Sequence, residues 1–178
     1  MRNAAMNTQI LVVGAGPTGL ALAIALRLQG LNAVIIDRQA QGANTSRAAV
    51  IHARTLSMLD PLGVSASLVE QGVCVPHFRV RDRDRILLEI DFDTLSGKYP
   101  FTLMLPQDQT EAILLERLQK LGGQVHWSTE LRGVKHEGGR IVASVTAQSG
   151  PSEIAATWIV GCDGLHSRVR ELAGIEFL

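Results

Sequence analysis

Apolar and polar positions divide the first forty residues into three elements. Gln9–Val13 is a short, mostly apolar run without alternation and is followed by a glycine, which predicts a buried strand. Thr18–Gln29 is apolar on nearly all sides and ends at Gly30, which predicts a helix buried against a sheet. Asn32–Ile36 is a second apolar, β-branched run that is too short for a helix. Together they predict a β-α-β unit with parallel strands and a right-handed crossover.

The pattern changes in the middle of the chain. A polar, loop-like stretch is followed by Leu56–Gln71, whose helical pattern is interrupted at Pro61. Phe78–Val80 and Ile86–Phe92 then alternate or cluster as antiparallel strands do. The charged residues 81–85 between them are interpreted as a solvated hairpin turn. This hairpin is an excursion from the β-α-β arrangement.

The last third of the chain returns to helix followed by strand. Asp108–Leu121 has a helical period, and Gln124–Trp127 is predicted as a third parallel strand. Glu130–Lys135, Ile141–Gln148 and Glu153–Val160 are predicted as strands of a meander, because turn sequences rich in glycine and serine separate them. The element order predicts the α/β class, a Rossmann-like doubly wound parallel sheet with an antiparallel β-meander and a small β excursion.

Composition and charge narrow the class of protein. The chain has 178 residues, of which 46% are hydrophobic and 19% charged, and these values suit a compact α/β domain rather than a disordered chain. The formal net charge is zero, so the charge balance favours neither nucleic acid nor an anionic membrane as a partner. Two cysteines are too few for a disulfide framework, and the apolar stretches are too short for a membrane span. We therefore expect a cytoplasmic protein.

The segment from Gly14 to Gly19 carries the first chemical signal. It has the G-x-G-x-x-G pattern, with Pro17 and Thr18 at variable positions, and it lies between a predicted strand and a predicted helix. Gly14 permits the tight turn, Gly16 keeps side-chain atoms away from a pyrophosphate, and Gly19 lets the helix and strand pack closely. The amino terminus of the helix offers unpaired N–H groups to the phosphates. The pattern predicts a dinucleotide site.

An acidic residue completes this dinucleotide signature. Asp37 ends the second predicted strand, 18 residues after Gly19, where a carboxylate can accept hydrogen bonds from both hydroxyls of an adenosine ribose. The carboxylate would repel a 2′-phosphate, so we expect a nucleotide other than NADP here. Arg38 is a further candidate for a phosphate contact, although a solvated loop arginine is the commoner occurrence. The fingerprint itself leaves NAD and FAD both open.

Four segments spread along the chain are distinctive when they are taken together. They are the glycine fingerprint with Asp37, residues 46–64 with Arg47, residues 105–122 with Gln107, and residues 159–174 with Asp163 and Gly164. These segments resemble those of the FAD-dependent aromatic hydroxylases, the class A flavoprotein monooxygenases that include phenol, hydroxybenzoate and polyketide hydroxylases. The resemblance implies that Arg47 reaches the phosphate and ribityl region of FAD, Gln107 contacts the ribityl chain, and Asp163 binds the ribityl hydroxyls. Ser167 is predicted to cap the helix after Asp163.

The resemblance also implies a reaction. In this family NAD(P)H reduces the bound FAD, which reacts with O2 to give a C4a-hydroperoxyflavin that hydroxylates an activated, usually phenolic ring. A small aromatic substrate and O2 are therefore the expected partners, with NAD(P)H as a transient reductant. Because the flavin carries the chemistry, we name no catalytic side chain. The spacing of the histidines predicts no metal site.

Two other functions remain open at this point. An NAD-linked dehydrogenase domain would explain the glycine fingerprint, but it leaves Arg47, Gln107 and Asp163 without a role. A non-catalytic flavin-binding module would suit the short chain.

The length of the chain differs from that of the family it resembles. Family members are considerably longer and carry a second Gly-Asp motif, which this sequence lacks. We expect residues 1–178 to be the amino-terminal part of an FAD-binding domain whose carboxyl-terminal remainder is absent. Residues 76–105 are expected to contribute to the substrate-domain sheet. Apolar surface left uncovered by the missing part predicts self-association into homo-oligomers.

Overall fold

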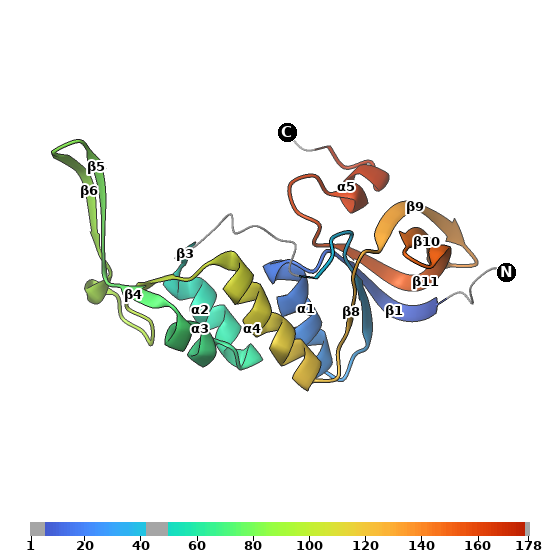
Figure 1. Cartoon of the computed structure of the whole chain (residues 1–178), viewed down its shortest axis with the longest axis horizontal. Helices are drawn as coiled ribbons and strands as arrows, with labels where there is room; N and C mark the ends of the chain where they lie inside the picture. Colours follow the sequence, from blue (N-terminus) through green and yellow to red (C-terminus); the bar gives the residue numbers. More distant parts are fainter. Residues whose placement is uncertain (1–5, 42–49, 177–178) are drawn as a thin grey trace. The chain divides into compact units, whose positions relative to one another are not determined.

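Six strands form the main sheet of the protein, in the order β8-β2-β1-β11-β10-β9 (Figure 1). The computed structural model describes residues 6–41 and 50–176. It divides into two units, one made of Met1–Asn44 with Leu114–Leu178 and the other of Thr45–Ile113, and each is described by itself. No helix among the described residues has the length and apolar character needed to cross a membrane.

The β-α-β unit forms as the sequence predicts. β1 (Met6–Val13) and β2 (Ala33–Ile36) are parallel neighbours, and α1 (Pro17–Leu28) connects them. The first residue of α1 is Pro17, which suits this position because the missing N–H would have no partner there. The chain leaves α1 through Gly30, whose φ of 74° lies in the left-handed region that favours glycine.

The last strand of the chain lies beside the first. β11 (Gly150–Gly161) pairs in parallel with β1, and the register places Val13 opposite both Gly161 and Ile36. β8 (Val125–His126) adds in parallel to the other side of β2. The four parallel strands therefore end at one edge of the sheet, which is where open α/β sheets bind their ligands.

An antiparallel meander completes the sheet. β9 (Glu130–Glu137) and β10 (Arg140–Ala147) follow each other and continue into β11, so the predicted meander is confirmed. The short helix α5 (Arg168–Leu172) follows β11 and packs Val169 and Leu172 against the core. That core is a cluster of buried apolar side chains from five of the six strands: Leu11, Val13, Ile36, Leu131, Ala143, Val145, Ile154 and Ala156.

The second unit begins with short helices. α2 (Ala53–Leu59) and α3 (Ser65–Gln71) are separated by the 3-10 turn η1 (Asp60–Leu62), so the predicted interruption at Pro61 is confirmed. Tyr99 is buried in this unit, and its hydroxyl donates a hydrogen bond of 2.6 Å to Asp60.

The second unit also holds two small sheets. The first, β3-β7-β4, consists of Val50–Ile51, Thr102–Met104 and Val73–Val75, and the sequence did not predict it. The second is the predicted hairpin of β5 (His77–Asp82) and β6 (Arg85–Asp91), which is exposed along its whole length. The 3-10 turn η2 (Phe92–Thr94) follows the hairpin, and the helix α4 (Gln107–Lys120) follows β7. The boundary between the two units falls within α4.

Candidate functional site

The carboxyl-terminal ends of β1, β2 and β11 bring together three segments that are far apart in the sequence. Gly14 follows β1, Asp37 follows β2, and the Asp-Gly segment follows β11. The N–H of Gly14 donates to the carbonyl of Ile36 at 2.8 Å, and the N–H of Cys162 donates to the carbonyl of Val13 at 2.7 Å. The backbone ladder thus continues past the strands and holds the three segments at one edge.

The carboxylate of Asp37 lies against the glycine loop. One of its oxygens accepts a hydrogen bond from the N–H of Ala15 at 2.7 Å, and the other accepts one from the N–H of Gln39 at 2.8 Å. These two donors fix the orientation of the side chain, and each carboxylate oxygen keeps a second lone pair for a ligand hydroxyl. The predicted neighbourhood of Asp37 and the fingerprint is therefore present, and contact with a ribose stays a prediction.

Two glycines of the fingerprint are required by close contacts. Gly14 has a φ of 103°, and a Cβ there would lie 2.4 Å from the carbonyl oxygen of Cys162. A Cβ on Gly19 would lie 1.9 Å from the carbonyl oxygen of Gly14. The Gly19 contact is the close helix–strand packing that the sequence predicts. The approach of Cys162 to Gly14 joins the glycine fingerprint directly to the Asp-Gly segment, and the fingerprint alone gives no sign of it.

The amino terminus of α1 has no side-chain cap. Its N-cap residue is Gly16, with an extended backbone, and Pro17 is the first residue of the helix. Thr18 is exposed at this end. Because no side chain caps the helix, the N–H groups of its first turn remain for water or for an anion, and the helix dipole favours the anion. Gly16, Pro17 and Thr18 lie at this uncapped helix end, and their contact with phosphates stays a prediction.

Asp163 uses both carboxylate oxygens to start α5. One oxygen accepts a hydrogen bond of 2.6 Å from the hydroxyl of Ser167. The other accepts from the N–H of Arg168 at 2.6 Å and from the N–H of Val169 at 3.2 Å. Ser167 in turn accepts from the N–H of Arg170 at 3.1 Å, which confirms the predicted cap. The carboxylate therefore shapes the turn at Gly164, whatever it contributes to a ligand.

The thiol of Cys162, which lies between the glycine loop and Asp163, has a raised pKa. Cys162 is half-buried at the end of β11, and burial is the main cause that raises the pKa of its thiol. The neighbouring carboxylate of Asp163 raises the same pKa further. The thiolate of Cys162 is thus disfavoured, which is typical of a packed thiol rather than a reactive one.

We expect Cys162 to be alkylated by iodoacetamide more slowly than the exposed Cys74, because alkylation requires the thiolate. Its rate should keep rising at alkaline pH, since the raised pKa delays ionisation. Peptide mass spectrometry over a pH series measures both thiols in one sample. Asp163→Asn should speed the reaction only in part, because burial remains. Equal rates for the two thiols at neutral pH would contradict this assignment.

Within the part of the chain that it describes, the structure shows no contact of the other three predicted site residues with these segments. Gln107 belongs to the second unit, where it is the first residue of α4 and its side-chain amide donates to Glu111 at 2.7 Å. Arg38 follows Asp37 and is exposed, and it has no carboxylate partner within residues 6–41 and 50–176. Arg47 lies outside the described residues.

One group of potential metal ligands in the described part of the chain escaped the sequence analysis. His77, Asp91 and Asp93 meet at the base of the β5–β6 hairpin, with a nitrogen of His77 3.3 Å from Asp91 and the other 3.7 Å from Asp93. All three are exposed. Strand pairing creates this group, so the spacing of histidines could not show it. We interpret it as a polar cluster that closes the hairpin.

Comparison with known proteins identifies similar sequences. Residues 7–178 match the family described as FAD binding domain. The 6-methylpretetramide 4-monooxygenase of Streptomyces rimosus is 40% identical over 172 residues, which are 96% of this chain and 31% of that protein. Pentachlorophenol 4-monooxygenase of Sphingobium chlorophenolicum is 34% identical over 174 residues, with 94% and 32% covered.

A solved structure agrees with these matches. The OxyS anhydrotetracycline hydroxylase from Streptomyces rimosus superposes with a TM-score of 0.88 at 32% identity, over 97% of this chain and 35% of that chain. The fold prediction is thereby confirmed. The chain spans about a third of the length of the proteins it matches.

Proposed function

The chain belongs to the FAD binding domain family, and we propose that it holds the adenosine, pyrophosphate and ribityl parts of FAD in an aromatic monooxygenase. The observation that carries this proposal is the meeting of Gly14, Asp37 and the Asp-Gly segment at one edge of the sheet. Since the chain covers about a third of its relatives, FAD binding is proposed for the chain itself and hydroxylation for the whole protein.

The residues at this edge fit an FAD. The uncapped amino terminus of α1 suits the pyrophosphate, because its N–H groups and dipole stabilise negative charge. Asp37 is oriented by two backbone donors and keeps lone pairs for the ribose hydroxyls. Asp163 and Gly164 form the turn that would face the ribityl chain, and Arg38, Arg47 and Gln107 are proposed as further contacts. These groups bind and orient, and none is proposed as an acid, a base or a nucleophile.

The chemistry would come from the cofactor. When bound, the flavin accepts electrons from NAD(P)H and activates O2 for transfer to the substrate. The relatives are named for 6-methylpretetramide, pentachlorophenol and anhydrotetracycline. We propose a phenolic or polyketide-like aromatic substrate for this protein too. Both cysteines are free thiols, which is consistent with the reducing cytoplasm that we propose as its location.

The hairpin of the second unit is proposed to serve the substrate side. Phe78 pairs with Ile90 and Val80 pairs with Leu88 across the two strands, and all four side chains are exposed. An isolated two-stranded hairpin is marginally stable, so an apolar face of this kind needs a covering layer. We propose that residues 76–105 contribute to the substrate-domain sheet of the whole protein. The same face would favour self-association of the 178-residue chain.

A flavin fluorescence titration tests the proposed cofactor. We expect the chain to bind FAD, with NAD⁺ competing poorly. Asp37→Ala should weaken FAD binding by roughly 10-fold or more, because it removes a charged acceptor of ribose hydrogen bonds. Asp84→Ala, at the exposed hairpin tip, is the matched control and should bind FAD as the natural chain does.

The possible results separate the alternatives. Preference for NAD⁺ over FAD would favour the dehydrogenase domain instead. Binding of neither nucleotide would contradict the proposal that this chain is sufficient for FAD. Equal losses in Asp37→Ala and Asp84→Ala would show that Asp37 has no special role in the site.

A further inference from the structure

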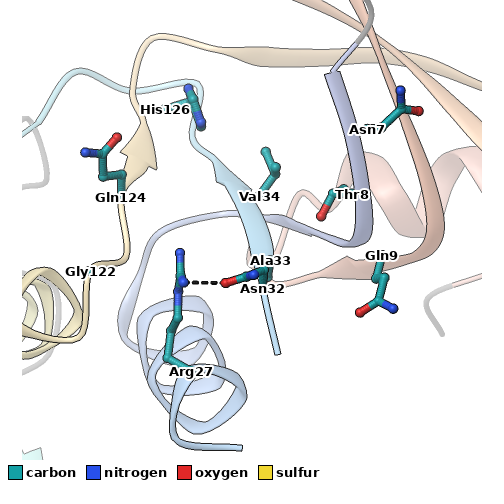
Figure 2. A pocket seen from close by; sticks show the side chains of 10 residues that line it. All are labelled: Asn7, Thr8, Gln9, Arg27, Asn32, Ala33, Val34, Gly122, Gln124 and His126. Carbon is teal, nitrogen blue, oxygen red and sulfur yellow. Dashed lines mark hydrogen bonds between the residues drawn. The ribbon is translucent and has the colours of Figure 1, made fainter. Parts of the chain in front are cut away.

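A cavity lies at the opposite, amino-terminal edge of the main sheet. Ala33, the first residue of β2, pairs with Ile10, so residues 6–9 of β1 extend beyond the start of β2. β8 pairs with β2 only at Ile35 and Ile36. The late start of β2 leaves a notch between its neighbours, and a cavity of about 580 Å³ occupies it (Figure 2). This volume is within the range of small-molecule sites, roughly 300–1,000 Å³.

The lining of the cavity has basic side chains and no acidic one. It consists of Asn7, Thr8, Gln9, Arg27, Asn32, Ala33, Val34, Gly122, Gln124 and His126. Figure 2 shows Arg27 extending from the end of α1 toward the start of β2, where its guanidinium donates a hydrogen bond to the side-chain oxygen of Asn32. Among residues 6–41 and 50–176, no carboxylate pairs with Arg27. Arg27 is half-buried, and it places an unpaired positive charge at the edge of an open pocket.

The helix dipole explains only part of this arrangement. Arg27 lies in the last turn of α1, where the negative end of the dipole favours a cation. That interaction does not use the remaining N–H donors of the guanidinium, which have no partner within residues 6–41 and 50–176. A guanidinium presents its donors in a plane that matches phosphate and carboxylate groups. The helix dipole also does not account for the absence of acidic residues around the cavity.

From these observations we propose that the cavity binds a small anion that carries a phosphate or carboxylate group together with hydroxyls. Arg27 would hold the charged group. The amide of Gln124 and the hydroxyl of Thr8 supply donors and acceptors, as recognition of hydroxyl groups requires, whereas the amide oxygen of Asn7 already accepts a hydrogen bond of 3.2 Å from Arg140. His126 adds a further ring nitrogen on the side of β8.

This site is separate from the proposed FAD site. The cavity involves residues 7–9 of β1, whereas the proposed FAD site lies at the other edge of the sheet, after Val13. Four residues of strand span about 13 Å, so one ligand at the cavity does not occupy the positions of the cofactor. An anion could therefore bind here while FAD is bound, because the two sites lie at opposite ends of β1 and of α1.

Two-dimensional ¹H–¹⁵N NMR of the chain tests this proposal. Inorganic phosphate and citrate are added in separate titrations at constant ionic strength, with sodium chloride as the reference salt. We expect saturable shifts of the side-chain amides of Asn32 and Gln124. The stronger response shows whether the site prefers phosphate or carboxylate. Saturation of the sample with FAD should leave the response in place.

Three variants make the outcome decisive. Arg27→Gln should lower the affinity by about 10-fold or more, whereas Arg79→Gln, in the other unit, should leave it unchanged. Gln124→Glu places a negative charge in the lining without removing the Arg27–Asn32 bond, and it should abolish binding even if Arg27→Gln fails to fold. Shifts that do not saturate, that match those in sodium chloride, that persist in Gln124→Glu, or that FAD removes would each overturn the proposal.

Discussion

Gly14→Ala is expected to abolish FAD binding and to lower the free energy of unfolding by about 3 kcal/mol. Two independent features of the backbone cause this. The φ of 103° is a conformation that L-residues rarely adopt, and the new Cβ would lie 2.4 Å from the carbonyl oxygen of Cys162. The neighbour is backbone and cannot rotate away, so the ends of β1 and β11 would have to separate. The glycine loop would then no longer present its N–H groups at the edge of the sheet where we propose that FAD binds.

Gly30→Ala is the matched control for this prediction. Gly30 also has a positive φ, of 74°, but an added Cβ would meet nothing within 4 Å. It should therefore cost only about 1 kcal/mol of backbone strain and leave FAD binding intact. Urea unfolding followed by circular dichroism measures stability, and flavin fluorescence measures binding. Equal effects of the two substitutions on stability and binding would show that the contact with Cys162 is unimportant.

Asp163→Ala should release the amino terminus of α5 and weaken FAD binding together. The substitution removes the acceptor of three hydrogen bonds, from Ser167, Arg168 and Val169. We expect a loss of about 2 kcal/mol in stability, because the two N–H groups lose a charged acceptor. Faster amide hydrogen exchange across residues 168–172 would report the release of α5, and the flavin titration would report binding.

Two further variants separate the roles of Asp163. Asp163→Asn keeps one oxygen as an acceptor for the backbone N–H groups, so α5 should stay protected from exchange. Ser167→Ala removes only the cap to Arg170 and should cost about 1 kcal/mol. If Asp163→Asn weakens FAD binding while α5 stays protected, the carboxylate contacts the cofactor directly. Unchanged exchange in Asp163→Ala would contradict the capping role that we assign to it.

Local patterns accounted for the main sheet, whereas long-range pairing did not show in the sequence. β1, β2 and α1 follow from apolar runs bounded by glycine, and the meander follows from strands separated by turn residues. β3, β4 and β7 have only two or three residues each. Such segments have no measurable period, and they become strands only because β7 pairs with both of the others.

The residues of the candidate site also fall into those that a local motif reveals and those that only the fold brings together. Gly14 and Asp37 belong to a local fingerprint whose spacing has a physical reason, so the sequence located them. Asp163 was found only through resemblance, because its partners depend on how α5 begins. The residues that line the cavity at the amino-terminal edge of the sheet have no recognisable pattern in the sequence. Arg27, Asn32 and Gln124 come together only because β1, β2 and β8 align.

The position of β11 beside β1 has a consequence for biosynthesis. Val13 pairs with Gly161, so the first strand emerges from the ribosome long before its partner exists. At roughly 5–20 residues per second, β1 waits on the order of ten seconds with one edge unpaired. Contacts between distant residues also make folding slow. The edge where we propose that FAD binds is therefore completed late in synthesis. Until then, the apolar strand β1 is protected from aggregation only by packing within the early β1-α1-β2 segment or by a chaperone.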